Sequence, residues 1–165
     1  MRQHALIACA ILAALLFPCT AAHALQFDTG LSASDAKEIY NYTLSMDKIQ
    51  KMAAATSSLQ ELGKHHPEMD NVQQSRSIDG MVQNIKRYPE AVASINRAGL
   101  TPREYVVCLM TVMQTSIAVG FKKSGTFKEY PPKLLQQVSR ANLDFTEQHW
   151  DEIRKLMPGG DSDGE

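Results

Sequence analysis

The sequence has few cysteines, which limits how the fold can be stabilised. It holds three in 165 residues, and two of them, Cys9 and Cys19, lie within the first 24 positions. If that segment is removed, Cys108 has no partner for an internal disulfide, and pairing with a second chain stays open. Because Cys108 stands between Val107 and Leu109, we expect it to be a small buried apolar side chain. Packing must then stabilise the fold.

An excess of positive charge is also missing. The chain has 17 basic and 18 acidic residues, which gives a formal net charge of −1. Arg2 is the one charged residue of segment 1–24 with histidine taken as neutral, so removing that segment leaves −2. Proteins that hold a phosphate backbone need a basic surface. We therefore expect no nucleic-acid partner.

Common catalytic motifs are absent from the sequence. It has no serine nucleophile elbow, no phosphate-binding glycine loop and no HExxH zinc motif. His149 could be paired with Glu104 or Glu129 for acid–base chemistry, but nothing in the spacing selects such a pair. We therefore expect a non-enzymatic protein without a cofactor.

The N-terminus is the most informative segment that is present. Arg2 supplies a positive charge, and residues 5–17 form an unbroken apolar run. Ala22-His23-Ala24 then places small residues at the −3 and −1 positions of a signal-peptidase site. The pattern predicts a signal peptide over residues 1–24, cleavage between Ala24 and Leu25, and a periplasmic or secreted protein. The apolar run is too short for a membrane anchor, so we expect no membrane association after cleavage.

The rest of the chain has the periodicity of helices. Apolar residues recur every three or four positions, and no segment alternates as a strand does. We predict a single all-α domain over residues 25–158 and a disordered acidic tail at 159–165. Ser34, Ser45 and Ser77 are each placed to cap the N-terminus of a helix. Gly63 is expected to end the helix that Ser45 begins.

Residues 102–122 carry the strongest helix signal. Thr101 is placed as the N-cap, Pro102 at the first helical position, and Glu104 three residues after the cap, as in a capping box. No charged residue occurs from position 105 to 121, so the helix should be surrounded on all sides by protein or lipid. We predict a helical bundle wrapped around this central helix. A single membrane span is an alternative, because the run is near the minimum length for crossing a bilayer.

A last helix is predicted after Ser139, with an extended link at Pro131-Pro132 before it. Three polar residues, Asn142, Thr146 and His149, fall on the side of this helix that is otherwise apolar and therefore buried. Buried polar groups need hydrogen-bonding partners. The middle of the central helix offers polar side chains that can supply them.

Two interpretations of the polar residues on the last helix and on the central helix stay open. They form either a hydrogen-bonded network that fixes how the helices pack or the polar end of a pocket for an apolar ligand. For the second interpretation, the candidate ligand-binding residues are Gln114, Ser116, Asn142, His149 and Trp150.

His65 and His66 begin the densest cluster of potential metal ligands, which extends to Asp70. Adjacent histidines usually point apart, and no second motif completes a tetrahedral site. Methionine is frequent and its thioether binds Cu(I), but most methionines fall on predicted core faces, where methionine is an adaptable filler. A solvated loop is therefore expected, and a periplasmic copper- or zinc-handling protein is an alternative function.

Four segments carry a resemblance to a known family. They are Leu44-Ser45-Met46-Asp47-Lys48, Tyr88-Pro89-Glu90-Ala91, Gly99-Leu100-Thr101-Pro102-Arg103-Glu104-Tyr105 and Asn142-Leu143-Asp144-Phe145. Through them the chain resembles small exported hypothetical proteins of Gram-negative bacteria whose function is unknown. The resemblance implies export and an all-helical domain and gives no activity or site. The sequence therefore predicts a binding or interaction protein whose partner is a protein or an apolar small molecule.

Overall fold

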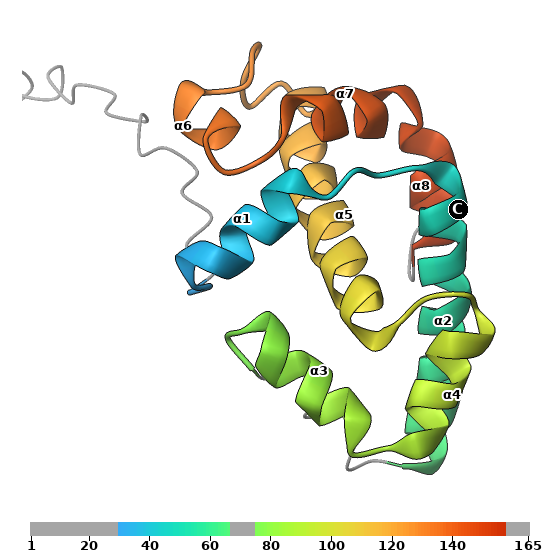
Figure 1. Cartoon of the computed structure of the whole chain (residues 1–165). Coiled ribbons are helices and arrows are strands. Elements are labelled where there is room, and N and C mark those ends of the chain that lie inside the picture. Colours follow the sequence, from blue (N-terminus) through green and yellow to red (C-terminus); the bar gives the residue numbers. More distant parts are fainter. Residues whose placement is uncertain (1–29, 67–74, 158–165) are drawn as a thin grey trace, which may run out of the picture.

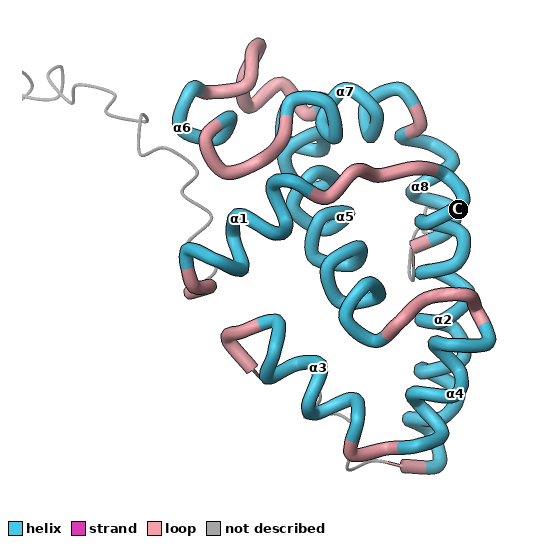
Figure 2. Tube along the Cα trace, in the orientation of Figure 1, coloured by secondary structure: helices cyan, strands magenta, loops and turns pink. Residues whose placement is uncertain are grey.

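The computed structural model describes residues 30–66 and 75–157, and every regular element in these ranges is a helix. Figures 1 and 2 show the arrangement. The helices are α1 (Ala33–Asn41), α2 (Met46–His65), α3 (Ile78–Lys86), α4 (Pro89–Arg97), α5 (Pro102–Lys123), α6 (Pro132–Leu135), α7 (Arg140–Gln148) and α8 (Trp150–Leu156). The predicted all-α class is confirmed. The predicted signal peptide, its cleavage site and the acidic tail lie outside the described residues.

Local hydrogen bonds explain where four helices begin. The hydroxyls of Ser32, Ser45, Ser77 and Thr101 each accept a backbone N–H three residues ahead, at 3.0 to 3.4 Å. This confirms the predicted caps at Ser45, Ser77 and Thr101. The prediction for Ser34 was wrong, because α1 begins two residues earlier than predicted, at Ala33, and Ser34 instead bonds the Ser32 hydroxyl.

The helices pack around α5, as predicted. Figure 1 shows α2 and α4 on one side of α5, α1 and α3 on the other, and α7 across its C-terminal end. The larger apolar cluster joins α1 to α5 with α8, and Cys108 is fully buried in it. A smaller cluster packs the C-terminal part of α5 against α6 and α7. The central helix thus carries both parts of the core.

Several predicted boundaries differ in the structure. Gly63 does not end α2, which continues to His65. Pro132 begins the short helix α6 instead of extending the link, because a proline at the first helical position needs no N–H partner. Ser139 stands at the start of α7 but makes no capping hydrogen bond. The last helix is broken at His149, whose backbone (φ −105°, ψ 22°) leaves the helical region between α7 and α8.

The other described helices do not enclose α5 on all sides, so its predicted enclosure by protein or lipid stays a prediction for one face. Met113 and Ile117 are each 44% exposed on one face of the helix. Among the described helices, α5 alone is long and apolar enough to cross a membrane, and half of that stretch is buried by other helices. The nine-residue α3 is joined through Asp79 to Arg103 at the start of the 22-residue α5.

Candidate functional site

A groove of about 740 Å³ opens between α2, α3, α4 and α5. We call it the α2–α5 groove, and it reaches the surface where the exposed Met113 forms part of its wall. Its lining residues are Thr56, Leu59, Gln60, Gly63, Lys64, Met81, Ile85, Ala91, Tyr105, Val106, Leu109, Met110 and Met113. The walls are mainly apolar, and Lys64 is the one charged residue among them.

Helical spacing brings these side chains together. Leu59 and Gly63 are four residues apart on α2, and Met81 and Ile85 are four apart on α3, so each pair shares a face. Small residues keep the space open. A Cβ atom added at Gly63 would have no atom of the described residues within 4 Å. The glycine in the last turn of α2 therefore leaves open space at this side of the groove.

A polar pair, the half-buried Thr56 and the buried Tyr105, lies where α2 meets α5. Thr56 Oγ1 donates to the carbonyl oxygen of Met52 at 2.9 Å and lies 3.1 Å from the hydroxyl of Tyr105. Tyr105 is 4% exposed, and its burial raises the pKa of its phenol. The phenol is therefore neutral at physiological pH. This pair gives an otherwise apolar groove a hydrogen-bonding position at its inner wall.

The charges at the rim are already paired. Lys64 Nζ lies 2.6 Å from Glu61 Oε2, and both side chains are more than half exposed. The hydrogen bond from Lys64 lowers the pKa of the Glu61 carboxyl. His65 Nε2 lies 4.0 Å from the other carboxylate oxygen. The mouth of the groove therefore offers little net charge to a ligand.

Three methionines, Met81, Met110 and Met113, line the groove. Core filling describes Met52, which is 1% exposed, but it does not describe Met113. Methionine side chains are flexible and polarizable, so a wall made of them can adapt to ligands of different shape. The groove is therefore suited to shape-tolerant binding of apolar groups.

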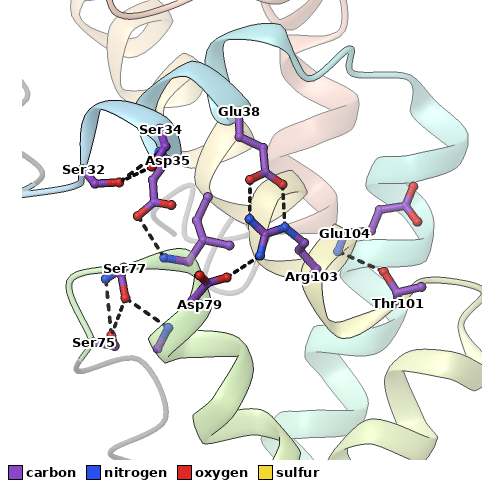
Figure 3. A network of polar contacts seen from close by, with 12 residues as sticks. Ser32, Ser34, Asp35, Glu38, Ser75, Ser77, Asp79, Thr101, Arg103 and Glu104 are labelled. Carbon is purple, nitrogen blue, oxygen red and sulfur yellow. Dashed lines mark hydrogen bonds and ion pairs between the residues drawn. The ribbon is translucent and has the colours of Figure 1, made fainter.

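A charge cluster holds the α3 wall in place (Figure 3). Arg103 at the start of α5 binds Glu38 of α1 through two hydrogen bonds, of 2.8 and 2.6 Å, and also binds Asp79 of α3. These hydrogen bonds raise the pKa of the guanidinium further. The buried Asp35 of α1 accepts the backbone N–H of Ile78 at 3.3 Å, at the N-terminus of α3, where the helix dipole favours a negative charge.

Asn142, a predicted site residue, is occupied by backbone contacts. Its Oδ1 accepts the N–H of Leu44 at 3.0 Å, and its Nδ2 donates to the carbonyl of Tyr42 at 2.6 Å. Both partners belong to the link between α1 and α2. Asn142 thus joins α7 to a segment that lies about 100 residues earlier in the chain.

A second polar contact joins α7 to the central helix. Thr146 donates to Thr115 Oγ1 at 2.9 Å, and both residues are fully buried. The Thr115 hydroxyl in turn lies 3.0 Å from the carbonyl of Thr111. These contacts agree with the interpretation of a network that fixes packing.

The other predicted site residues lie apart from the α2–α5 groove. Gln114 and Ser116 are half-buried on α5, and the Ser116 hydroxyl has no hydrogen-bond partner among the described residues. His149 stacks on Phe145 with ring centres 4.6 Å apart. Trp150 packs beside Gly120. Ligand binding at Gln114, Ser116, Asn142, His149 and Trp150 stays a prediction, and none of the five lines the groove.

The candidate metal ligands are dispersed where the structure describes them. His65 lies in the last turn of α2 and is 74% exposed, while His66 follows the helix. In residues 30–66 and 75–157, no three His, Cys, Asp or Glu side chains converge. The remainder of the predicted cluster, residues 67–70, lies outside the described part.

The fold and the groove define a class, an all-helical protein with one face of its central helix exposed beside an apolar groove. Comparison of the chain with protein-family models, curated proteins and solved structures finds no match. A functional assignment must therefore be argued from the chemistry of the groove.

Proposed function

We propose that this chain is an exported, non-enzymatic binding protein that holds an apolar small molecule in the α2–α5 groove. One observation carries the proposal, namely a space of about 740 Å³ with mainly apolar walls and few polar groups. Small-molecule sites typically occupy about 300–1,000 Å³ and have this kind of lining. The groove is thus the right size and chemistry for a ligand with a large apolar part.

The energetics favour an occupant. Apolar surface left in water costs about 25 cal/mol per Å² relative to burial. Met113, which is 44% exposed, leaves such surface at the mouth of the groove. A ligand that covers the walls would remove it from water without a change in the helices, and the methionine side chains can adjust to its shape.

Export is the second part of the proposal, and it is supported by the signal-peptide pattern at residues 1–24. Native mass spectrometry of protein recovered from the periplasm would report cleavage, oligomeric state and bound ligand in one measurement. A mass that begins at Leu25 supports export. A chain that retains residues 1–24 in the membrane fraction would contradict it.

Binding is tested with Nile red, a neutral dye that fluoresces in apolar surroundings. We expect saturable binding at one site per chain. Gly63→Phe should weaken it about tenfold or more, a change of about 1.4 kcal/mol, because the new ring enters space that is empty beside Gly63. Gly63→Ala is the matched control and should leave the affinity within about twofold.

The outcomes separate the candidate functions. Equal dye binding by the wild type and Gly63→Phe would place the dye elsewhere and contradict the proposal. Calorimetry with Zn²⁺ and Cu(I) covers the metal-handling alternative. Sub-micromolar affinity that is lost in the His65→Ala, His66→Ala double variant would favour that alternative.

A further inference from the structure

The Thr56 hydroxyl uses its proton in a hydrogen bond to a carbonyl, and this fixes the direction of its second hydrogen bond, to Tyr105. Thr56 has one hydroxyl proton, and it donates this proton to the carbonyl of Met52, which can only accept. The contact of 3.1 Å with Tyr105 must therefore use the tyrosine proton. Tyr105 donates and Thr56 accepts.

The inner wall of the groove consequently offers a ligand hydrogen-bond acceptors and no free donor from this pair. Tyr105 is buried and its phenol is neutral, because burial raises its pKa. Its proton points to Thr56, so the lone pairs of the Tyr105 oxygen are what a ligand can meet. Gln60 supplies both donor and acceptor groups, but it is exposed at the rim. A ligand that reaches the inner wall must bring its own donor.

A carboxylate fits this wall poorly. It has no proton at neutral pH, so it would oppose the lone pairs of Tyr105 and lose its hydration without compensation. Lys64 is the one cation among the described lining residues, and it is held at the rim by Glu61, 2.6 Å away, whose own charge repels an anion. A buried ammonium group would find no acidic side chain among the lining residues that the structure describes.

The wall that α5 gives to the groove is long. It runs from Tyr105 through Leu109 to Met113, about 12 Å along the helix at about 1.5 Å per residue. Its outer end, Met113, is exposed. This length favours an elongated chain with its polar end inside over a compact molecule.

Taking the proposed function as given, we infer that the groove selects uncharged long-chain amphiphiles with a hydrogen-bond donor, such as alcohols, over the corresponding carboxylates. The recognition element is the Tyr105 oxygen, whose proton is held by Thr56. The alkyl chain then lies along the methionines toward the exposed Met113.

The test compares 1-dodecanol with dodecanoate, which have chains of equal length, as competitors of Nile red at neutral pH and below their aggregation limits. We expect dodecanol to displace the dye at about tenfold lower concentration. Tyr105→Phe should weaken dodecanol about three- to tenfold, as loss of one neutral hydrogen bond does. The loss for dodecanol should exceed any loss for Nile red or dodecanoate, because neither of these donates a hydrogen bond to the Tyr105 oxygen.

A second variant tests the proton assignment. Thr56→Val keeps the shape of the side chain and removes the acceptor for Tyr105, so the tyrosine proton becomes available to the ligand. Dodecanoate should then bind more tightly than to the wild type, and the preference for dodecanol should shrink. Circular dichroism and a thermal melt check that both variants are folded.

The inference and the proposed function fail in different ways. If Nile red binds but dodecanoate competes as well as dodecanol, the inference is overturned and the binding function stands. An unchanged preference in both Tyr105→Phe and Thr56→Val overturns it as well. If neither the dye nor either amphiphile binds saturably, the proposed function itself is wrong.

Discussion

Asn142 and Leu44 lie 98 positions apart in the sequence and are joined by a 3.0 Å hydrogen bond in the interior. The same amide donates to the carbonyl of Tyr42, so one side chain satisfies two backbone groups in the link between α1 and α2. Leu44 N–H and the Tyr42 carbonyl lie in a link outside the helices, and Asn142 supplies the hydrogen bonds that a helix would otherwise give them. The position of α1 and the start of α2 therefore depends on a residue of α7.

The first prediction follows from this contact. Asn142→Ala should destabilise the fold by about 1–3 kcal/mol, because the buried Leu44 N–H and Tyr42 carbonyl lose their partner. Urea denaturation measures the change. Gln148→Ala on the exposed side of the same helix is the control, with an effect within about 0.5 kcal/mol. Equal effects of the two substitutions would show that water replaces the amide without cost.

The second prediction concerns the buried threonine pair. Thr115→Val removes the acceptor of the Thr146 hydroxyl and should cost about 1–2 kcal/mol, since the orphaned donor stays buried. Thr146→Val should cost less, because Thr115 keeps its own bond to the Thr111 carbonyl. The double variant should therefore be more stable than Thr115→Val alone. Strict additivity in a double-mutant cycle would contradict the donor direction.

The starts of the helices were predictable because their causes are local. Thr101, Pro102 and Glu104 are neighbours in the sequence, and the cap that they form needs no distant partner. The same holds for Ser45 and Ser77. For these helices, the spacing and the types of neighbouring residues are enough to predict where the helix begins.

The groove was not predictable, because its cause is tertiary. Which face of α5 stays exposed depends on where α3 lies, and Arg103 fixes α3 through Asp79, 24 residues away, and α1 through Glu38, 65 residues away. Periodicity shows that α5 is apolar all round, but it does not show which part of it the other helices leave exposed. Asn142 was identified as buried and polar, while its backbone partners could not be read from any spacing.

The third prediction concerns acid sensitivity. Lys122 Nζ lies 2.9 Å from both carboxylate oxygens of Glu147, and Tyr130 donates to the same group at 3.2 Å. The hydrogen bond from Lys122 is the largest cause of the lowered pKa of Glu147. Because the folded pKa lies below the unfolded value of about 4.3, this stabilisation is present above pH 4.3 and is lost as pH falls through the folded pKa.

Lys122→Met should accordingly reduce stability at pH 7 by less than about 1 kcal/mol, since the pair is partly exposed. The difference from the wild type should be smaller at pH 3 than at pH 7. Urea denaturation at both pH values measures it, and Lys133→Met on the exposed side of α6 is the control. A deficit that persists unchanged at pH 3 would mean that Lys122 acts through packing and not through Glu147.

The last prediction uses two helical glycines with opposite surroundings. A Cβ at Gly63 meets nothing within 4 Å, so Gly63→Ala should stabilise the fold by about 0.5–1 kcal/mol through helix propensity. At Gly80 a Cβ would overlap the hydroxyl of Ser75 and lie 2.9 Å from its Cβ atom. Gly80→Ala should therefore destabilise by about 1–3 kcal/mol despite the same gain in propensity. Chemical denaturation of the two variants measures the difference in sign. If both were equally stabilising, Ser75 would be free to move away, and the packing at the start of α3 would not hold this wall of the groove.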